Sequence, residues 1–311
     1  MINKLRGVVA AVLLLLGVFS FDARAGRGDD LYRRGSTLVS EATSREYQQE
    51  GARLIEEAAG MGHQAAQLAI ASLYSNGTGV EKNFDKAHRW FRMAADHGSV
   101  PAAFYVGFQH ELGRGVQQDY AEAAKWYRVA SGKGHADASF HLGLLFEKGL
   151  GVPQNFAAAA LYYRRAADKG DVPSTYNLAL LLEAGRGVPK DAASAANLYI
   201  KAAQAGMAEA QTALCELLLE GKAVQKDPTR AAGWCRAAAV QNYVPAQMRL
   251  ASLFGQGLGV AKDDVRAFAW LLLAASRKYQ PAMRMQQGFK GTLSADTLAK
   301  ARALSRTLLA Q

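Results

Sequence analysis

The sequence lacks the short motifs that mark the common classes of enzyme. It has no His-Glu-x-x-His, no Gly-x-Ser-x-Gly, no phosphate-binding loop ending in Gly-Lys-Ser or Gly-Lys-Thr, and no Cys-x-x-Cys. Fragments such as Gly113-Arg114-Gly115 lie between two predicted helices, whereas a dinucleotide fingerprint must follow a strand. We therefore predict no catalytic residue, no cofactor site and no metal site, and expect that the protein is not an enzyme.

Cysteine and histidine are too few to suggest a metal centre. The chain has two cysteines and six histidines, and the histidines form no ligand set in sequence. His110 holds a position that carries Tyr, Phe or Leu elsewhere in the chain. It is therefore predicted to be a partly buried core side chain, with a metal-binding, catalytic or proton-sensing role as the alternatives. No cysteine lies near residue 25, which argues against a lipid-anchored lipoprotein.

Long apolar runs are absent after residue 21, but one such run opens the chain. Lys4 and Arg6 precede an apolar stretch over residues 8–21, and Ala23-Arg24-Ala25 has the pattern of a signal peptidase site. The stretch is short for a membrane span, although an uncleaved anchor is the alternative. We predict a signal peptide over residues 1–25, no later transmembrane segment, and a periplasmic or secreted protein of a Gram-negative bacterium.

Acidic residues are outnumbered by basic ones. The net charge is +10, and removing residues 1–25 takes away three basic residues and one acidic residue, which leaves +8. A basic exported protein favours acidic partners such as an acidic envelope polymer. Nucleic acid is not expected beyond the export barrier. The basic residues are scattered without a long run, which is also typical of a generally soluble surface.

The sequence repeats itself every 36 residues without insertion or deletion. The six units cover residues 64–99, 100–135, 136–171, 172–207, 208–243 and 244–279. Each unit is predicted to form a short helix A, a glycine loop and a helix B. A glycine suited to a left-handed C-cap ends each helix A, at Gly77, Gly113, Gly149, Gly185, Gly221 and Gly257. A second glycine follows two residues later, except at Ala223.

Two further sets of positions define the repeat. The predicted N-caps of helix B, each worth roughly 1 kcal/mol over Ala, are Asn83, Asp119, Asn155, Asp191, Asp227 and Asp263. Alanines that let the helices approach closely are Ala87, Ala123, Ala159, Ala195, Ala231 and Ala267. They face small residues of helix A, namely Ala71, Gly107, Gly143, Ala179, Cys215 and Ala251. Large residues, including Trp90 and its equivalents in helix B, fill the rest.

The unit approximates A-x-x-x-L-G-x-x-Y-x-x-G-x-G-V-x-x-D-x-x-x-A-x-x-W-Y-x-x-A-A-x-x-G over residues 64–279. It resembles the Sel1-like repeat, a relative of the tetratricopeptide repeat. The resemblance implies an all-α fold: a right-handed superhelical solenoid of antiparallel helix pairs. It also implies an adaptor, because the family includes exported proteins of envelope signalling, polysaccharide export and host contact. Cysteine-rich members have been associated with β-lactams, but they carry a cysteine pair in nearly every repeat, and this chain does not.

The two ends of the repeat array are predicted to be caps. Residues 26–63 keep fragments of the pattern and are interpreted as an N-terminal capping hairpin. Residues 280–311 start another helix A and end in a further helix, and we interpret them as C-terminal capping helices. Solenoids need such caps to cover an otherwise open apolar face.

In the related tetratricopeptide geometry, helix A lines the concave surface, which predicts a partner-binding groove in units two to four. Its residues are Phe104, Phe108, Glu111, Phe140, Leu144, Glu147, Tyr176, Leu180 and Glu183. The aromatic column Phe104, Phe140 and Tyr176 would anchor a partner, or would instead pack between neighbouring repeats. The glutamates would form a solvated row rather than a catalytic pair, because neighbouring repeats lie on the order of 10 Å apart.

Cys215 and Cys235 lie in helix A and helix B of one unit. Export into an oxidising compartment favours a disulfide. The residue opposite Cys215 is expected to be Ala231, one turn before Cys235, so the Cα atoms could lie beyond the roughly 7 Å limit for bonding. The pair is predicted to be either bonded or jointly buried.

Two functions follow from these patterns. The first is a periplasmic scaffold or adaptor that holds a protein or peptide partner in the cell envelope. The alternative is an enzyme or sugar-binding protein that acts on peptidoglycan or exopolysaccharide.

Overall fold

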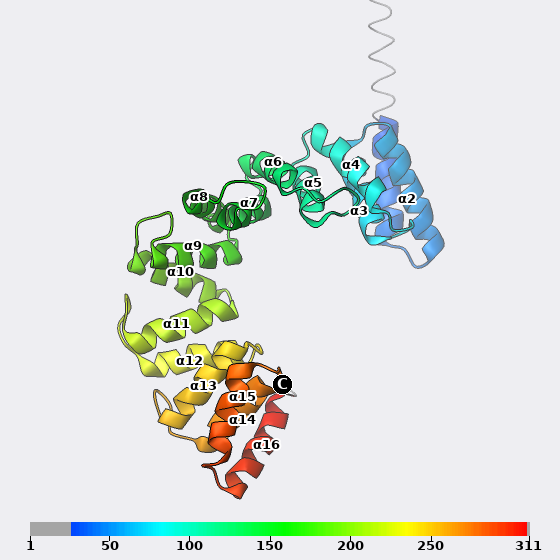
Figure 1. Cartoon of the computed structure of the whole chain (residues 1–311). Helices are drawn as coiled ribbons and strands as arrows, with labels where there is room; N and C mark the ends of the chain where they lie inside the picture. Colours follow the sequence, from blue (N-terminus) through cyan, green and yellow to red (C-terminus); the bar gives the residue numbers. More distant parts are fainter. Residues whose placement is uncertain (1–25, 310–311) are drawn as a thin grey trace, which may run out of the picture. The chain divides into compact units, whose positions relative to one another are not determined.

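The computed structural model describes residues 26–309, and every regular element in this range is an α-helix (Figure 1). The predicted signal peptide over residues 1–25 lies outside the described residues. Among the described helices, none combines the length and the apolar character that crossing a membrane requires. The chain divides into two compact units between Gln154 and Asn155, in the loop between the two helices of the third repeat.

The first unit starts with a helix over residues 26–40, followed by α2 (Arg45–Gly60). These helices lie within residues 26–63, where an N-terminal capping hairpin is predicted, and they approach closely at Gly35 and Gly51. A Cβ atom at either glycine would lie 2.7 Å from the carbonyl oxygen of the other. The repeats then follow as α3 (Gln64–Asn76), α4 (Phe84–Asp96), α5 (Val100–Leu112), α6 (Tyr120–Gly132) and α7 (Ala136–Lys148).

The second unit continues the same alternation of helix A and helix B. Its repeat helices are α8 (Phe156–Ala167), α9 (Val172–Ala184), α10 (Ala192–Gln204), α11 (Ala208–Glu220), α12 (Pro228–Ala239), α13 (Val244–Gln256) and α14 (Asp264–Ser276). Two final helices, α15 (Gln280–Lys290) and α16 (Ala295–Leu309), follow the last repeat. Both pack against α14.

The predicted helix ends are confirmed. Each of the six N-cap side chains of helix B accepts a hydrogen bond from a backbone N–H in the first turn of its helix. Each of the six C-cap glycines of helix A adopts a left-handed backbone, with φ between 67° at Gly113 and 83° at Gly77. The local sequence therefore fixes where every repeat helix begins or turns.

The second loop glycine has a different role, which is a close approach to the preceding repeat. A Cβ atom at Gly115 would lie 2.0 Å from the carbonyl oxygen of Phe84, at the start of α4. Gly115 also has a φ of 71°, so two separate constraints favour glycine there. Ala223, which replaces this glycine in the fifth repeat, keeps the left-handed conformation with a φ of 59°.

The core of each repeat combines small alanines with larger apolar side chains from both of its helices. The predicted alanines of helix B are all buried. Six large residues of helix B were expected to fill the core: Trp90, Trp126, Tyr162, Leu198, Trp234 and Trp270. Trp270 is buried and the other five are half-buried, whereas the residue after each of the six is fully enclosed. These enclosed residues are Phe91, Tyr127, Tyr163, Tyr199, Cys235 and Leu271. In the second repeat, a Cβ atom at Gly107 would lie 2.8 Å from the Tyr127 ring, so the glycine makes room for the tyrosine.

Cys215 and Cys235 form a disulfide, with Cα atoms 5.5 Å apart. Both are fully buried. They occupy the positions held by Gly107 and Tyr127 in the second repeat, so the bond replaces a packing contact between helix A and helix B. The Cα atoms are closer than expected from a packing in which Ala231 alone lies opposite Cys215. Cys235, one turn after Ala231 on helix B, also lies against Cys215.

Candidate functional site: an aromatic cavity on the helix A face

The first unit has a cavity of about 310 Å³ between α3 and α5, which are the helices A of the first two repeats. We call it the aromatic cavity. It is lined by Ser72, Ser75, Asn76, Lys82, Phe84, Phe91, Tyr105, Phe108, Gln109 and Arg114. Four of these ten side chains are aromatic and none is acidic. The first helices of the repeats, α3 and α5, supply six of the ten lining residues, and α4 and the loops supply the other four. We call the surface on the side of these first helices the helix A face.

Aromatic rings form the floor and one wall of the aromatic cavity. The Phe91 and Tyr105 rings stack with centroids 4.8 Å apart. Phe108, one turn after Tyr105 on α5, is half-buried, and Tyr105 keeps 40% of its surface exposed. Rings that are held by packing on one side and open on the other can contact a ligand at little entropic cost.

The cavity is bordered by small side chains where the second repeat has larger ones: Ser75 corresponds to Glu111, and Ser72 corresponds to Phe108. Shifted by 36 residues, Ser75, Phe91 and Tyr105 correspond to Glu111, Tyr127 and His141. At the equivalent place one repeat later, the Tyr127 and His141 rings also lie close to each other, with centroids 5.2 Å apart. There the glutamate fills the space beside them. The Ser75 hydroxyl instead bonds to the Ala71 carbonyl oxygen of its own helix, at 2.9 Å, and leaves the space open.

The equivalent position in the second repeat is closed by a hydrogen-bonded triad. The Glu111 carboxylate accepts a hydrogen bond from the Tyr127 hydroxyl, and it lies 2.9 Å from Nδ1 of His141. Burial raises the pKa of Glu111, but the bonds from His141 and Tyr127 outweigh it and hold this pKa below its ordinary value. Burial and the adjacent carboxylate raise the pKa of Tyr127. The triad therefore holds α5, α6 and α7 together.

Two cations flank the aromatic cavity. Nζ of Lys82 lies 4.9 Å from the centroid of the Phe84 ring, and Cζ of Arg114 lies 5.6 Å from the same centroid. Both side chains are exposed, and neither forms an ion pair within the described part of the chain. The rim is thus positively charged and retains free hydrogen-bond donors.

The structure separates the predicted groove residues into accessible and inaccessible ones. Phe104 is 9% exposed, and its ring stacks on His135 at 4.7 Å and lies 5.8 Å from Tyr127. The prediction that Phe104 anchors a partner is therefore wrong. Its ring packs between repeats, which is the alternative that the sequence left open. Phe140 is half-buried with its ring 5.4 Å from that of His141, and Leu144 is also half-buried.

The glutamates do not form one uniform solvated row. Glu111 keeps 20% of its side chain exposed and is engaged in the triad, and Glu147 is half-buried. Glu183 is exposed, although it accepts a hydrogen bond of 2.7 Å from the Tyr199 hydroxyl. The prediction of a solvated row thus fits Glu183 and fails at Glu111.

Tyr176, Leu180 and Glu183 belong to the second unit and are described within it. The Tyr176 ring lies 5.6 Å from that of Tyr199 and is half-buried. Leu180 is 40% exposed. This unit thus presents an apolar residue at the position that Phe108 holds in the first unit.

Several residues of the site were not identified from the sequence. They are Lys82, Phe84, Tyr105, Arg114, Tyr127 and His141. A signal for Tyr127 was present: in repeats two to four, tyrosine follows the large helix B residue, which is Trp126, Tyr162 or Leu198. These are the repeats that carry Glu111, Glu147 and Glu183. Residues that change together between repeats indicate a contact, and this pairing predicts the bond between Tyr127 and Glu111.

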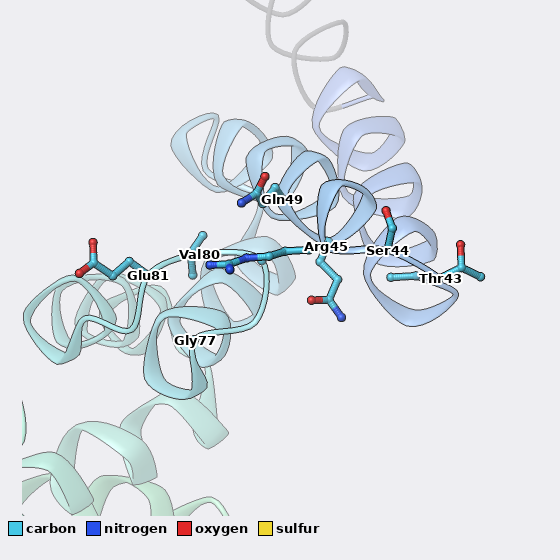
Figure 2. Close-up of a pocket in the computed structure, with 10 residues that line it drawn as sticks. Thr43, Ser44, Arg45, Gln49, Gly77, Val80 and Glu81 are labelled. Carbon is cyan, nitrogen blue, oxygen red and sulfur yellow. The ribbon is translucent and has the colours of Figure 1, made fainter.

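A larger cavity of about 660 Å³ lies at the N-terminal end of the first unit (Figure 2). Thr43 and Ser44 from the turn before α2 lie at one side of it, and the Arg45 side chain extends toward Val80 and Glu81 (Figure 2). Thr43, Arg45 and Glu81 are exposed. Exposed polar side chains lose more freedom on binding than packed rings do, so we favour the aromatic cavity as the site despite its smaller volume.

Histidines in the described range serve mainly in structure. His63 and His135 are the N-caps of α3 and α7, where Nδ1 accepts a backbone hydrogen bond. His110 is buried, with its ring 5.3 Å from that of His88. Within residues 26–309, no cluster of three His, Cys, Asp or Glu side chains could hold a metal ion.

Comparison with known proteins gives a family. The Sel1 repeat profile matches residues 64–99, 100–135, 136–171, 172–207, 208–243 and 244–279. No curated protein matches the sequence. Among solved structures, a Sel1 repeat protein from Oxalobacter formigenes is 31% identical, with a TM-score of 0.65 over 81% of this chain and 96% of that one. A protective antigen of uropathogenic Escherichia coli with an SLR fold is 23% identical, with a TM-score of 0.52 over 91% of this chain and 84% of that one.

The similarity to the Escherichia coli antigen shows a shared fold alone, whereas the Sel1 repeat matches cover most of the chain. Their boundaries are those of the 36-residue period in the sequence. The protein therefore belongs to the Sel1 repeat family and is a helical-repeat scaffold of the kind that commonly serves protein interaction.

Proposed function

We propose that the protein is an exported scaffold that binds a polypeptide partner of the cell envelope on its helix A face. The aromatic cavity carries this proposal. It combines accessible rings at Tyr105 and Phe108 with a packed floor at Phe91, which is the composition that recurs at peptide-binding anchors. Location in the periplasm rests on the signal sequence pattern of residues 1–25.

Partner binding is expected to centre on the first unit and to extend along the helix A face through Leu144 and Phe140. Tyr176, Leu180 and Glu183 belong to the second unit, and we propose them as partner contacts of that unit alone. Roles in envelope signalling, polysaccharide export or host contact are compatible with a scaffold of this kind, and the identity of the partner would decide among them.

The test is crosslinking and capture from the periplasm with the mature chain and two variants. Phe108→Ala removes a wall of the cavity, and Ser75→Gln fills it with a side chain of the size that the second repeat carries. Both should reduce capture of a specific polypeptide at least about thirtyfold, with little change in melting temperature. Val240→Ala is the control, because Val240 is 59% exposed on the second unit.

Capture that is unchanged in both cavity variants would contradict the proposal. The sugar-binding alternative has one structural support, which is the polar N-terminal cavity of Figure 2. Binding of peptidoglycan fragments that is lost in Gln49→Ala and kept in Phe108→Ala would favour that alternative.

A further inference from the structure

The charges around the aromatic cavity bear on what kind of peptide it binds, which the proposed function leaves open. We propose that the cavity recognises an aromatic side chain flanked by acidic residues within a polypeptide partner. This inference rests on the proposed function and adds the chemistry of the ligand.

The volume of the cavity limits the anchor to one or two side chains. At about 310 Å³ it lies at the lower end of the roughly 300–1,000 Å³ range of small-molecule sites. Four of its lining side chains, Phe84, Phe91, Tyr105 and Phe108, offer ring faces or edges. An aromatic side chain gains offset or edge-to-face contacts with such rings in addition to the burial of its surface.

The rim determines what lies beside that anchor. Lys82 comes from the loop before α4 and Arg114 from the loop after α5, so the two cations belong to different repeats and both contact the Phe84 ring. No acidic side chain lines the cavity. A basic peptide would be repelled there, whereas acidic side chains next to the anchor could form charge-assisted hydrogen bonds with both cations.

The chain supplies a matched comparison for these cations. Arg186 holds the position of Arg114 two repeats later, and its Cζ lies 4.1 Å from the centroid of the Phe156 ring. Lys262 holds the position of Lys82 in the sixth repeat. Neutralising Arg186 and Lys262 therefore removes the same charge from equivalent loops without touching the aromatic cavity.

The experiment selects peptides from a random library, displayed internally in a coat protein, on the intact mature chain. Enriched sequences are then synthesised with amidated C-termini, and their affinities are measured by fluorescence anisotropy. We expect enrichment of aromatic residues flanked by Asp or Glu. Affinity should fall at least about thirtyfold in Phe108→Ala and about tenfold in the Lys82→Gln/Arg114→Gln double variant.

The loss in the double variant should shrink as salt is raised, because an exposed rim charge is screened. The Arg186→Gln/Lys262→Gln control should bind as the wild type does. Phe108-dependent peptides that lack acidic residues, or that need a free C-terminal carboxylate, would overturn the inference and leave the proposed function standing. If no enriched peptide depends on Phe108, both the inference and the proposed function fail.

Discussion

Replacing Glu111 by Ala should destabilise the first unit by about 2–3 kcal/mol. The Glu111 carboxylate accepts a hydrogen bond from the Tyr127 hydroxyl and forms a second one with His141. A hydrogen bond to a charged group is worth about 1.5–3 kcal/mol. Two such bonds would suggest a larger loss. Because 20% of the side chain is exposed, water can reach the vacated donors and offset part of it.

Glu183→Ala is the matched control for this prediction. Glu183 holds the same repeat position and accepts a hydrogen bond from Tyr199 at 2.7 Å, but it is exposed. Its replacement should therefore cost about 1 kcal/mol or less. The contrast between the two variants isolates the burial and the second bond of Glu111.

The effect of Glu111→Ala should depend on pH. The pKa of Glu111 in the folded protein lies below its ordinary value of 4.5, so the folded state favours the ionised carboxylate. Its stabilising contribution is complete above that ordinary value and is lost as the pH falls through the folded value. The difference in unfolding free energy between wild type and Glu111→Ala should thus narrow between pH 7 and pH 3.

The measurement is urea unfolding of the mature chain, with amide hydrogen exchange to follow α5, α6 and α7 separately. Exchange is needed because long repeat arrays do not always unfold in one step. A Glu111→Ala variant within about 0.5 kcal/mol of the wild type, the size of ordinary surface effects, would refute the triad as a stabilising contact.

Three further predictions concern other parts of the chain. Cys215→Ala/Cys235→Ala should lose about 3 kcal/mol by the chain-entropy relation for a 20-residue separation, and intact mass after alkylation without reductant should show no free thiol in the wild type. Ala223→Gly should gain about 1 kcal/mol in unfolding free energy, because it removes a Cβ from a backbone with φ of 59°, and an unchanged or lower value would contradict that strain. N-terminal sequencing of periplasmic protein should begin at Gly26, whereas a cytosolic chain that starts at Met1 would contradict export.

The fold was largely predictable because each repeat carries its own local signals. An Asn or Asp at the start of helix B and a glycine at the end of helix A act within a few residues, and six copies in one phase remove ambiguity. The distance between the Cα atoms of Cys215 and Cys235 was less predictable. It depends on how helix A and helix B are each rotated about their own axes, which the sequence does not fix.

The site was only partly predictable, because the exposure of a helix A residue depends on its neighbours in the next repeat. Phe104 and Phe108 are one turn apart on α5, yet Phe104 is covered by His135 and Phe108 faces the cavity. The cavity is bordered by the small residues Ser72 and Ser75, where the next repeat has Phe108 and Glu111. The effect of such a difference on the shape of the surface can be seen only when the packing between repeats is known.

The most direct test of the central claim is photocrosslinking from the cavity itself. A photoreactive phenylalanine analogue would replace Phe108 in the intact exported chain, and the same analogue at Val240 would serve as the control. Position 108 is expected to crosslink a discrete polypeptide in the cell envelope, and Ser75→Gln in the same chain should abolish that product. Identical products from both positions, or a product at 108 that persists when the cavity is filled, would contradict the claim that this cavity binds a polypeptide partner.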